Sequence, residues 1–238
     1  MAEAPVLKED LERCFALHRF EIGGERRPFI SFSHSGTHTR NMVKSETVKF
    51  MCVGALGPNK DRIKNHSLVV DCAENIRRDA SAGPFKIAVV GFNEGSRKTT
   101  REVADAFPDC FDFHGTLTYP QMYDVMRGSD FIISALDPEN PGHRDQYLRH
   151  VCSGPFAQSV GFQIPLVVNE EFAKTYGFDE RTAVLYKGND LEKAMRRAIA
   201  MPPDEYTRMC AALGEMKTAH QRESLENMER VFGKANDN

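Results

Sequence analysis

The chain has 238 residues, 41% of them hydrophobic and 27% charged, and its formal net charge is −3. These values are ordinary for a globular protein, and the small negative charge gives no reason to expect nucleic acid as a partner. No apolar run approaches the roughly 20 residues of a membrane-spanning helix, and the first residues lack the pattern of a signal peptide, so we expect a cytoplasmic protein.

Six cysteines are spread along the chain without a Cys-x-x-Cys pair. They are Cys14, Cys52, Cys72, Cys110, Cys152 and Cys210. Several lie in apolar segments with strand or helix composition, so we expect reduced and mostly buried thiols, as is usual in the cytoplasm.

Residues 1–47 are charged or polar and show little periodicity, which indicates an N-terminal extension and linker. A short helix within residues 7–20, a strand at 28–33 and a long polar connection up to residue 47 are expected there. Stronger patterns begin at Val48, so residues 48–238 are predicted to form one domain.

Six apolar runs in this domain have strand composition: residues 48–56, 85–92, 111–117, 131–136, 164–168 and 183–189. Helical segments are predicted at residues 67–78, 96–107, 119–130, 153–163 and 191–201, the last with Asp190 as its cap. Residues 169–182 are expected to span a short helix and a turn, and residues 204–232 form one long helix or two broken near Gly214. Strands separated by helical segments need crossover connections, which give a parallel sheet. We therefore predict an α/β fold with a doubly wound, Rossmann-like sheet of about six strands and a long C-terminal helix.

Ligands bind beyond the carboxyl ends of the strands in such a sheet, so the segments after the strands are the candidate sites. The first strand ends at Gly54 and leads into a turn with the cations Lys60, Arg62 and Lys64. Glycine lets a ligand approach the backbone and cations suit phosphate oxygens, although a solvated basic turn is equally ordinary. The spacing is not that of a P-loop.

The next two strands end in a similar way. The second closes with Gly91, followed by Asn93, and a glycine there either serves the turn or lets a ligand lie over the backbone. The third closes with His114, Gly115, Thr116 and Leu117. His114 is most simply interpreted as a histidine at the end of a strand, without a chemical role. The backbone groups of Gly115, Thr116 and Leu117 could instead contact the edge of a nucleobase, and Tyr119 could pack on the face of that base. Thr118 and Pro120 are typical of a helix start.

The long segment after the fourth strand carries Asp137, Glu139, Asn140, Arg144 and Tyr147 before a helix begins near residue 153. Ser153 suits the N-cap, Gly154 removes side-chain obstruction and Pro155 suits the first turn. Such a helix start either is simply capped or binds an anion. After the fifth strand, Glu170 and Glu171 are expected to be helix-start carboxylates, with a sugar-hydroxyl acceptor as the alternative.

Other chemistries find little support. His34 and His38 have the spacing of metal ligands but no third ligand nearby. The sequence contains no G-x-S-x-G nucleophile elbow and no G-x-G-x-x-G dinucleotide fingerprint. A serine hydrolase and a standard nicotinamide or flavin enzyme are therefore not expected.

The order of these pieces resembles the C-terminal, donor-binding domain of GT-B-fold glycosyltransferases. The likeness rests on VKFMCVGALGPNKDRIKN, FKIAVVGFNE, HGTLTYPQMYDVMRGSDFIISAL and SGPFAQSVGFQIPLVV, and covers roughly residues 48–230. It implies a Rossmann-like domain that binds a nucleoside-diphosphate sugar as substrate, without a metal or other cofactor.

The resemblance also implies roles for single residues. Lys60 and Arg62 would hold the diphosphate, Gly54 and Gly91 would let it approach, and residues 114–117 would meet the base. Ser153 and Gly154, with the helix dipole behind them, would take the distal phosphate, while cations and dipole neutralise the leaving group. No residue is assigned as the general base.

The chain departs from the family in two respects. Retaining members carry a glutamate in the phosphate-facing helix where this sequence has Gln158. The family also needs an N-terminal acceptor-binding domain, and residues 1–47 are too few to form one, so a further domain or a partner chain is expected to supply it. Two alternatives follow: a non-catalytic interaction module with this fold, or a nucleotide-sugar epimerase-like enzyme.

Overall fold

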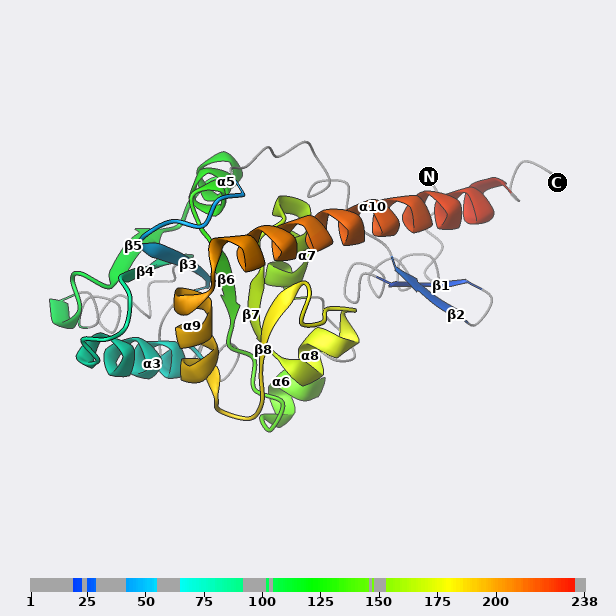
Figure 1. Cartoon of the computed structure of the whole chain (residues 1–238). Helices are drawn as coiled ribbons and strands as arrows, with labels where there is room; N and C mark the ends of the chain where they lie inside the picture. Colours follow the sequence, from blue (N-terminus) through cyan, green and yellow to red (C-terminus); the bar gives the residue numbers. More distant parts are fainter. Residues whose placement is uncertain are drawn as a thin grey trace.

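The computed structural model of the chain describes residues 19–22, 25–28, 42–54, 65–91, 102, 105–145, 147 and 153–233. Its centre is a six-stranded sheet, and every neighbouring pair of strands is parallel. The strands are β3 (Val48–Val53), β4 (Phe85–Val90), β5 (Phe111–Gly115), β6 (Phe131–Ser134), β7 (Leu166–Asn169) and β8 (Ala183–Tyr186). Their order across the sheet is β5-β4-β3-β6-β7-β8, which confirms the predicted doubly wound fold (Figure 1).

Helices cover both faces of the sheet. They are α3 (His66–Arg78), α5 (Tyr119–Arg127), α6 (Pro141–Asp145), α7 (Gly154–Phe162), α8 (Glu170–Thr175), α9 (Leu191–Ala200) and α10 (Pro203–Gly233). The prediction for residues 96–107 falls mainly outside the described residues. Because successive side chains of a strand point to opposite faces, Phe50 and Cys52 of β3 join one buried cluster and Met51 joins the other. The first cluster includes α3 and α9, and the second α5, α7 and α8.

The long helix α10 joins the two layers. Tyr206 and Cys210, near its start, are buried in the first cluster, whereas Leu213 is buried in the second. The Tyr206 hydroxyl donates to the Asp130 carbonyl just before β6, and Lys217 Nζ donates to Gly161 O near the end of α7. Both contacts lie at the amino ends of strands, so α10 leaves the opposite, carboxyl edge of the sheet open.

The distal part of α10 extends beyond the sheet, and a small hairpin lies beside it (Figure 1). The hairpin consists of β1 (Arg19–Ile22) and β2 (Glu25–Pro28), which pair antiparallel. The expected strand at 28–33 and helix within 7–20 fall almost wholly outside the described residues. The extension therefore contributes at least one element that its weak periodicity did not indicate.

The described cysteines agree with their prediction. Cys52, Cys72, Cys110 and Cys210 are buried thiols, and burial raises the pKa of Cys72 to about 12. Cys14 and Cys152 lie outside the described residues. Among the described helices, none is long and apolar enough to cross a membrane.

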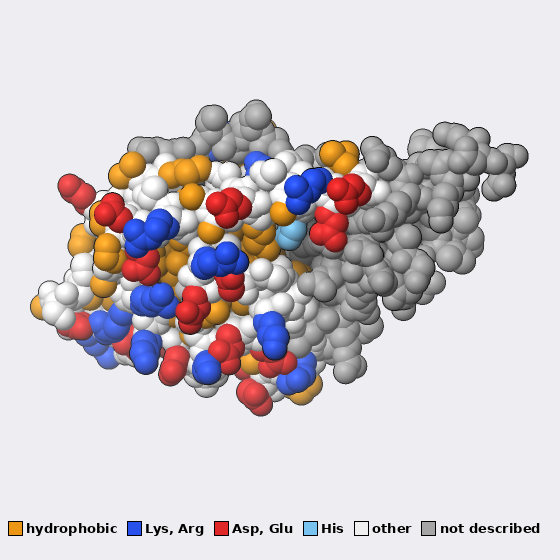
Figure 2. Space-filling view, turned by 45° about the vertical axis from the view of Figure 1, so that its right-hand side comes forward, with side chains coloured by type: hydrophobic (Ala, Val, Ile, Leu, Met, Phe, Trp, Pro, Cys, Tyr) orange, Lys and Arg blue, Asp and Glu red, His pale blue; other side chains and the backbone are white. Residues whose placement is uncertain are grey.

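The face seen in Figure 2 carries Lys, Arg, Asp and Glu side chains interspersed with one another. No single sign dominates this face, so it does not have the one-signed patch that a polyanion would need.

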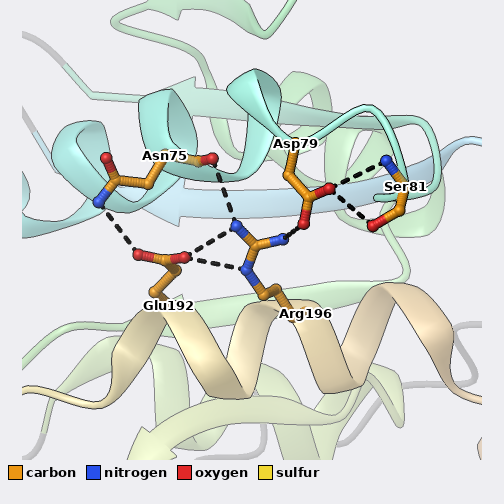
Figure 3. Close-up of polar contacts among 5 residues, drawn as sticks. All are labelled: Asn75, Asp79, Ser81, Glu192 and Arg196. Carbon is orange, nitrogen blue, oxygen red and sulfur yellow. Dashed lines mark hydrogen bonds and ion pairs between the residues drawn. The ribbon is translucent and has the colours of Figure 1, made fainter.

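Polar contacts fasten α3 to α9 (Figure 3). Arg196 on α9 donates to Asp79 at 2.6 Å, to Glu192 at 2.9 Å and to the Asn75 carbonyl at 3.3 Å. Asn75 Nδ2 in turn donates to Glu192 at 3.0 Å. Hydrogen bonds from Ser81 and the neighbouring Arg196 hold the pKa of Asp79 below its usual value.

We expect Arg196→Ala to lower the melting temperature more than Arg197→Ala, because Arg197 makes a single 3.4 Å contact with Glu205. The lowered pKa of Asp79 sets the sign of the pH effect: its stabilisation is present above the unfolded pKa near 4 and is lost as pH falls through the lower folded value. Thermal unfolding of both variants at pH 7 and pH 3 measures this. Equal melting temperatures for the two variants at pH 7 would contradict the expectation.

Candidate functional site

Three glycines lie side by side where β3, β4 and β5 end, and we call them the glycine row: Gly54, Gly91 and Gly115. The Gly54 N–H donates to the Val90 carbonyl at 2.6 Å, and the Gly91 N–H donates to the Gly115 carbonyl at 2.9 Å. All three have left-handed backbone, with φ of 130°, 106° and 64°. Side chains rarely adopt these values, so the residue type at each position follows from the backbone.

The glycine row is also tightly packed at its centre. A Cβ atom at Gly91 would stand 3.2 Å from Gly54 Cα and 3.3 Å from Gly54 N. At Gly115, by contrast, a Cβ would meet nothing within 4 Å. The row therefore consists of backbone without side chains at the carboxyl edge, with space next to Gly115 among the described residues.

The segment after β5 carries an exposed aromatic ring four residues after Gly115. Tyr119, at the start of α5, is 70% exposed, and its ring lies 6.1 Å from that of Tyr123. The helix start is fixed by Gln121, whose side-chain oxygen accepts from the Thr118 N–H at 3.0 Å and hydroxyl at 2.9 Å. His114 and Thr116 are exposed, and Leu117 packs on the second buried cluster.

The chain after β6 is held by a buried histidine. The Asp137 N–H donates to His143 Nδ1 at 3.0 Å, so this nitrogen accepts and the proton is on Nε2. Asn140 Oδ1 accepts from the Gly142 N–H at 2.9 Å and so helps to start α6. Arg144 on α6 pairs with Glu171 at 3.0 Å. Neither His143 nor Asn140 was recognised as a structural residue from the sequence.

Helix α7 begins as the sequence predicts. Ser153 occupies the N-cap position, although its hydroxyl makes no capping hydrogen bond, and Pro155 lies in the first turn. Gly154 is exposed, and a Cβ there would stand 3.7 Å from Gln158 Nε2. The side chain of Gln158 is therefore directed back toward the start of α7, as helix geometry favours. Gln158 is only 6% exposed, and its Oε1 has no hydrogen-bond partner among the described residues.

The carboxylates after β7 are engaged in ion pairs. Glu170 pairs with Lys187 at 3.5 Å and Glu171 with Arg144 at 3.0 Å. Both lie in the first turn of α8, which confirms that they are helix-start carboxylates. Asn169 caps this helix by accepting from the Glu171 N–H at 3.0 Å. The predicted cap of α9 differs: Asp190 holds the N-cap position but makes no capping hydrogen bond.

A hollow of about 300 Å³ lies beside the edge strand β8, lined by residues from Glu180 to Asp190 and by α9. Leu185, Tyr186 and Ala194 are among the residues that line this hollow. The lining also contains acidic and basic residues in equal number. The Tyr186 hydroxyl donates to the Ser134 carbonyl at 3.4 Å, and burial raises the pKa of Tyr186. With no excess of either charge, this hollow has no evident preference for an ionic ligand.

Several predicted site residues lie outside the described residues: Lys60, Arg62, Asn93, and the histidine pair His34 and His38. The described members gather at one edge of the sheet. Gly54, Gly91 and Gly115 form its backbone surface, with Tyr119 beyond one end and the start of α7 toward the other. The residue that the sequence pattern did not reveal is Asn169. Its position directly after an apolar strand is the feature of the sequence from which it could have been recognised as a candidate.

No protein-family model matches the sequence, and no curated protein matches it. Solved structures do match. WaaG, a glycosyltransferase involved in lipopolysaccharide biosynthesis, matches 87% of this chain with a TM-score of 0.55 and 11% identity. HepE from Anabaena, solved in complex with UDP and glucose, matches 81% with a TM-score of 0.56 and 11% identity. The C-terminal domain of LpcC, a glycosyl transferase group 1 family protein from Francisella tularensis, matches 72% with a TM-score of 0.51 and 8% identity.

The fraction of each matched protein that this chain covers differs between the neighbours. The chain spans 85% of the LpcC C-terminal domain but only 38% to 55% of five other neighbours. At these identities the likeness establishes the fold, which is that of a GT-B glycosyltransferase-like domain, as the sequence resemblance predicted.

Proposed function

We propose that this chain is the donor-binding part of a glycosyltransferase and that it binds a nucleoside-diphosphate sugar along the carboxyl edge of its sheet. The observation that carries the proposal is the glycine row, because three adjacent strand ends present left-handed, side-chain-free backbone. Bare backbone of this kind admits a flat or highly charged ligand at contact distance. The neighbouring WaaG and LpcC folds belong to glycosyltransferases, which agrees with this assignment.

The order of the strands suggests how the ligand lies. The base would sit near Gly115 and against the exposed ring of Tyr119, and the diphosphate would cross Gly91 and Gly54. The distal phosphate would then meet Ser153 and Gly154 at the start of the nine-residue helix α7, where Gly154 is exposed and the helix dipole favours an anion. Lys60 and Arg62 would add positive charge. Helix dipole and cations would thus stabilise the leaving diphosphate without a metal.

The acceptor would bind to another domain or to a partner chain. The described residues of the sheet domain provide the donor edge, and the chain spans about half of WaaG and of HepE. Transfer would therefore require this domain to face an acceptor-binding one, which also would supply any general base.

Titration with UDP and with GDP, followed by calorimetry and thermal unfolding, tests the proposal. We expect one of the two nucleotides to raise the melting temperature at millimolar concentration, because a ligand that binds only the folded state stabilises it. Absence of any shift with either nucleotide would overturn the donor-binding assignment.

Lys60→Ala is expected to weaken binding of the nucleoside diphosphate about tenfold and binding of the nucleoside much less, because an ammonium–phosphate contact contributes on the order of 1.5 kcal/mol. Lys187→Ala is the matched control, since Lys187 is an exposed lysine of the same edge that pairs with Glu170. Equal losses for nucleoside and nucleotide would show that Lys60 does not meet the phosphates.

A non-catalytic module with the same fold is the second candidate, and Gln158 favours it. A neutral amide stands where retaining relatives have a carboxylate, and it is buried. Such a module would bind no nucleotide, so the titration separates the two. A nucleotide-sugar epimerase-like enzyme would bind the nucleotide but convert the sugar, which product analysis detects.

A further inference from the structure

A buried amide donor at the end of β7 lacks a partner. Asn169 is 1% exposed, and its Nδ2 has no hydrogen-bond partner among the described residues. An unsatisfied buried donor costs about 1–3 kcal/mol, so native structures keep few of them. Its position, directly after a buried strand at the carboxyl edge, is the usual place for a ligand contact in a parallel sheet.

The orientation of this amide is fixed by the protein. Asn169 Oδ1 accepts the Glu171 N–H at 3.0 Å, which assigns oxygen and nitrogen without ambiguity. The Nδ2 group is therefore the one without a partner among the described residues, and its orientation is fixed because Oδ1 accepts from the backbone two residues further along. A locked donor costs little entropy when it binds a ligand.

The neighbouring carboxylates take part in ion pairs at the surface. Glu170 is paired with Lys187, and Glu171 with Arg144. Asn169 differs from them because its amide is buried and one of its polar atoms has no hydrogen-bond partner among the described residues. Within α7, the buried Oε1 of Gln158 also has no hydrogen-bond partner among the described residues.

The free amide N–H of Asn169 is a donor, and a sugar hydroxyl can accept this hydrogen bond. In the proposed arrangement the base lies near β5 and the distal phosphate at α7. The sugar beyond that phosphate then falls toward β7, four inter-strand spacings or about 19 Å from β5.

We propose that the side-chain amide of Asn169 binds a hydroxyl of an uncharged sugar on the donor. This inference rests on the proposed function. The amide is screened from water, which strengthens a hydrogen bond made to it, and a neighbouring side chain must shift to admit the sugar.

Asn169→Ser separates the two roles of the residue, since serine keeps an N-cap acceptor and removes the amide donor. The probes are UDP and GDP, and UDP-glucose, UDP-N-acetylglucosamine and GDP-mannose. For the native protein we expect at least one sugar nucleotide to bind more tightly than its diphosphate. In Asn169→Ser that advantage should fall about tenfold, with affinity for the diphosphate unchanged and the melting temperature not lowered.

Asn189→Ser, in the exposed turn after β8, is the matched control and should behave as the native protein. An unchanged sugar advantage in Asn169→Ser overturns the inference. Equal weakening of diphosphate and sugar nucleotide, or a large fall in melting temperature, also overturns it, because either result assigns Asn169 to structure alone. Should the native protein bind neither diphosphates nor sugar nucleotides, the proposed function itself fails; binding of diphosphates with no sugar advantage defeats the inference only.

Discussion

Asp130→Ala is expected to destabilise the protein by about 3 kcal/mol, because a buried carboxylate that serves several donors is lost. Asp130 is 2% exposed and precedes β6. Its Oδ1 accepts from the Ser45 N–H at 3.0 Å and hydroxyl at 3.2 Å, and its Oδ2 accepts from the Lys49 N–H at 2.8 Å. Removing the carboxylate leaves two backbone donors without acceptors. For a domain of this size the melting temperature should fall by roughly 6–12 °C.

The control for this variant is Asp124→Ala, because the Asp124 side chain is 72% exposed and forms an ion pair with Arg127, three residues further along the same helix. Its removal should change stability by less than about 0.5 kcal/mol. Asp130→Asn keeps one acceptor and should fall between the two. Chemical denaturation measures all three. If Asp130→Ala loses no more stability than Asp124→Ala, the carboxylate does not anchor the segment before β3.

Asp130 also illustrates what a local sequence pattern leaves out. An Asp after Gly128 and Ser129 looks like part of a turn, and nothing local indicates that it binds the backbone of residues 45 and 49. The same holds for Lys44, whose Nζ donates to the carbonyls of Ile199 and Met201 at 2.6 Å. Contacts between segments more than 80 residues apart depend on the finished topology, which a local pattern does not contain.

The sheet, in contrast, was predictable strand by strand. Strands of a parallel sheet are covered on both faces, so they read as continuous apolar runs, as in Phe131–Ser134 and Leu166–Asn169, which are buried throughout. Five of the six predicted runs begin at the observed first residue, and five end two or three residues too late. The glycine and small polar residues that follow the strands do not show at which residue the hydrogen bonds between neighbouring strands stop.

Gly214 explains why the sequence is compatible with either one long C-terminal helix or two shorter ones. A glycine in a long helical pattern weakens the helix, and a break there was a reasonable alternative. The structure runs α10 through Gly214 without interruption. A Cβ at this position would stand 2.8 Å from Gln163 Nε2, so the glycine makes room for a side chain from the end of α7. Gln163 itself has a left-handed φ of 56°, where glycine would be expected. Packing, not turn formation, explains the glycine at position 214.

Some features of the candidate site could also be predicted from the sequence, and others could not. Glycines at strand ends and the Ser153–Gly154–Pro155 helix start were visible in the sequence, because backbone requirements restrict residue type. The ion pairs that occupy Glu170 and Glu171 were not visible, since Lys187 and Arg144 come from other elements. The sequence therefore indicates helix-start carboxylates at Glu170 and Glu171, with a sugar contact as the alternative, and gives no role to Asn169.

Gly91→Ala is expected to affect both folding and ligand binding strongly. A residue with a side chain at φ 106° carries strain of about 1–3 kcal/mol. The added methyl also meets Gly54 Cα at 3.2 Å, and because this neighbour is backbone, the ends of β3 and β4 must move apart. We expect a loss of about 2–4 kcal/mol in total and, below the melting temperature, at least tenfold weaker binding of the diphosphate, whose proposed path crosses these two glycines.

Gly188→Ala is the matched control for the backbone strain. Its φ of 48° is also left-handed, but a Cβ there meets nothing within 4 Å, so it should lose about 1 kcal/mol and leave nucleotide affinity unchanged. Denaturation curves and titration of the folded variants at low temperature measure the difference. Equal stability losses for the two variants would mean that the approach of Gly91 to Gly54 is not restrictive. Unchanged affinity in a folded Gly91→Ala protein would mean that the diphosphate does not lie over the glycine row.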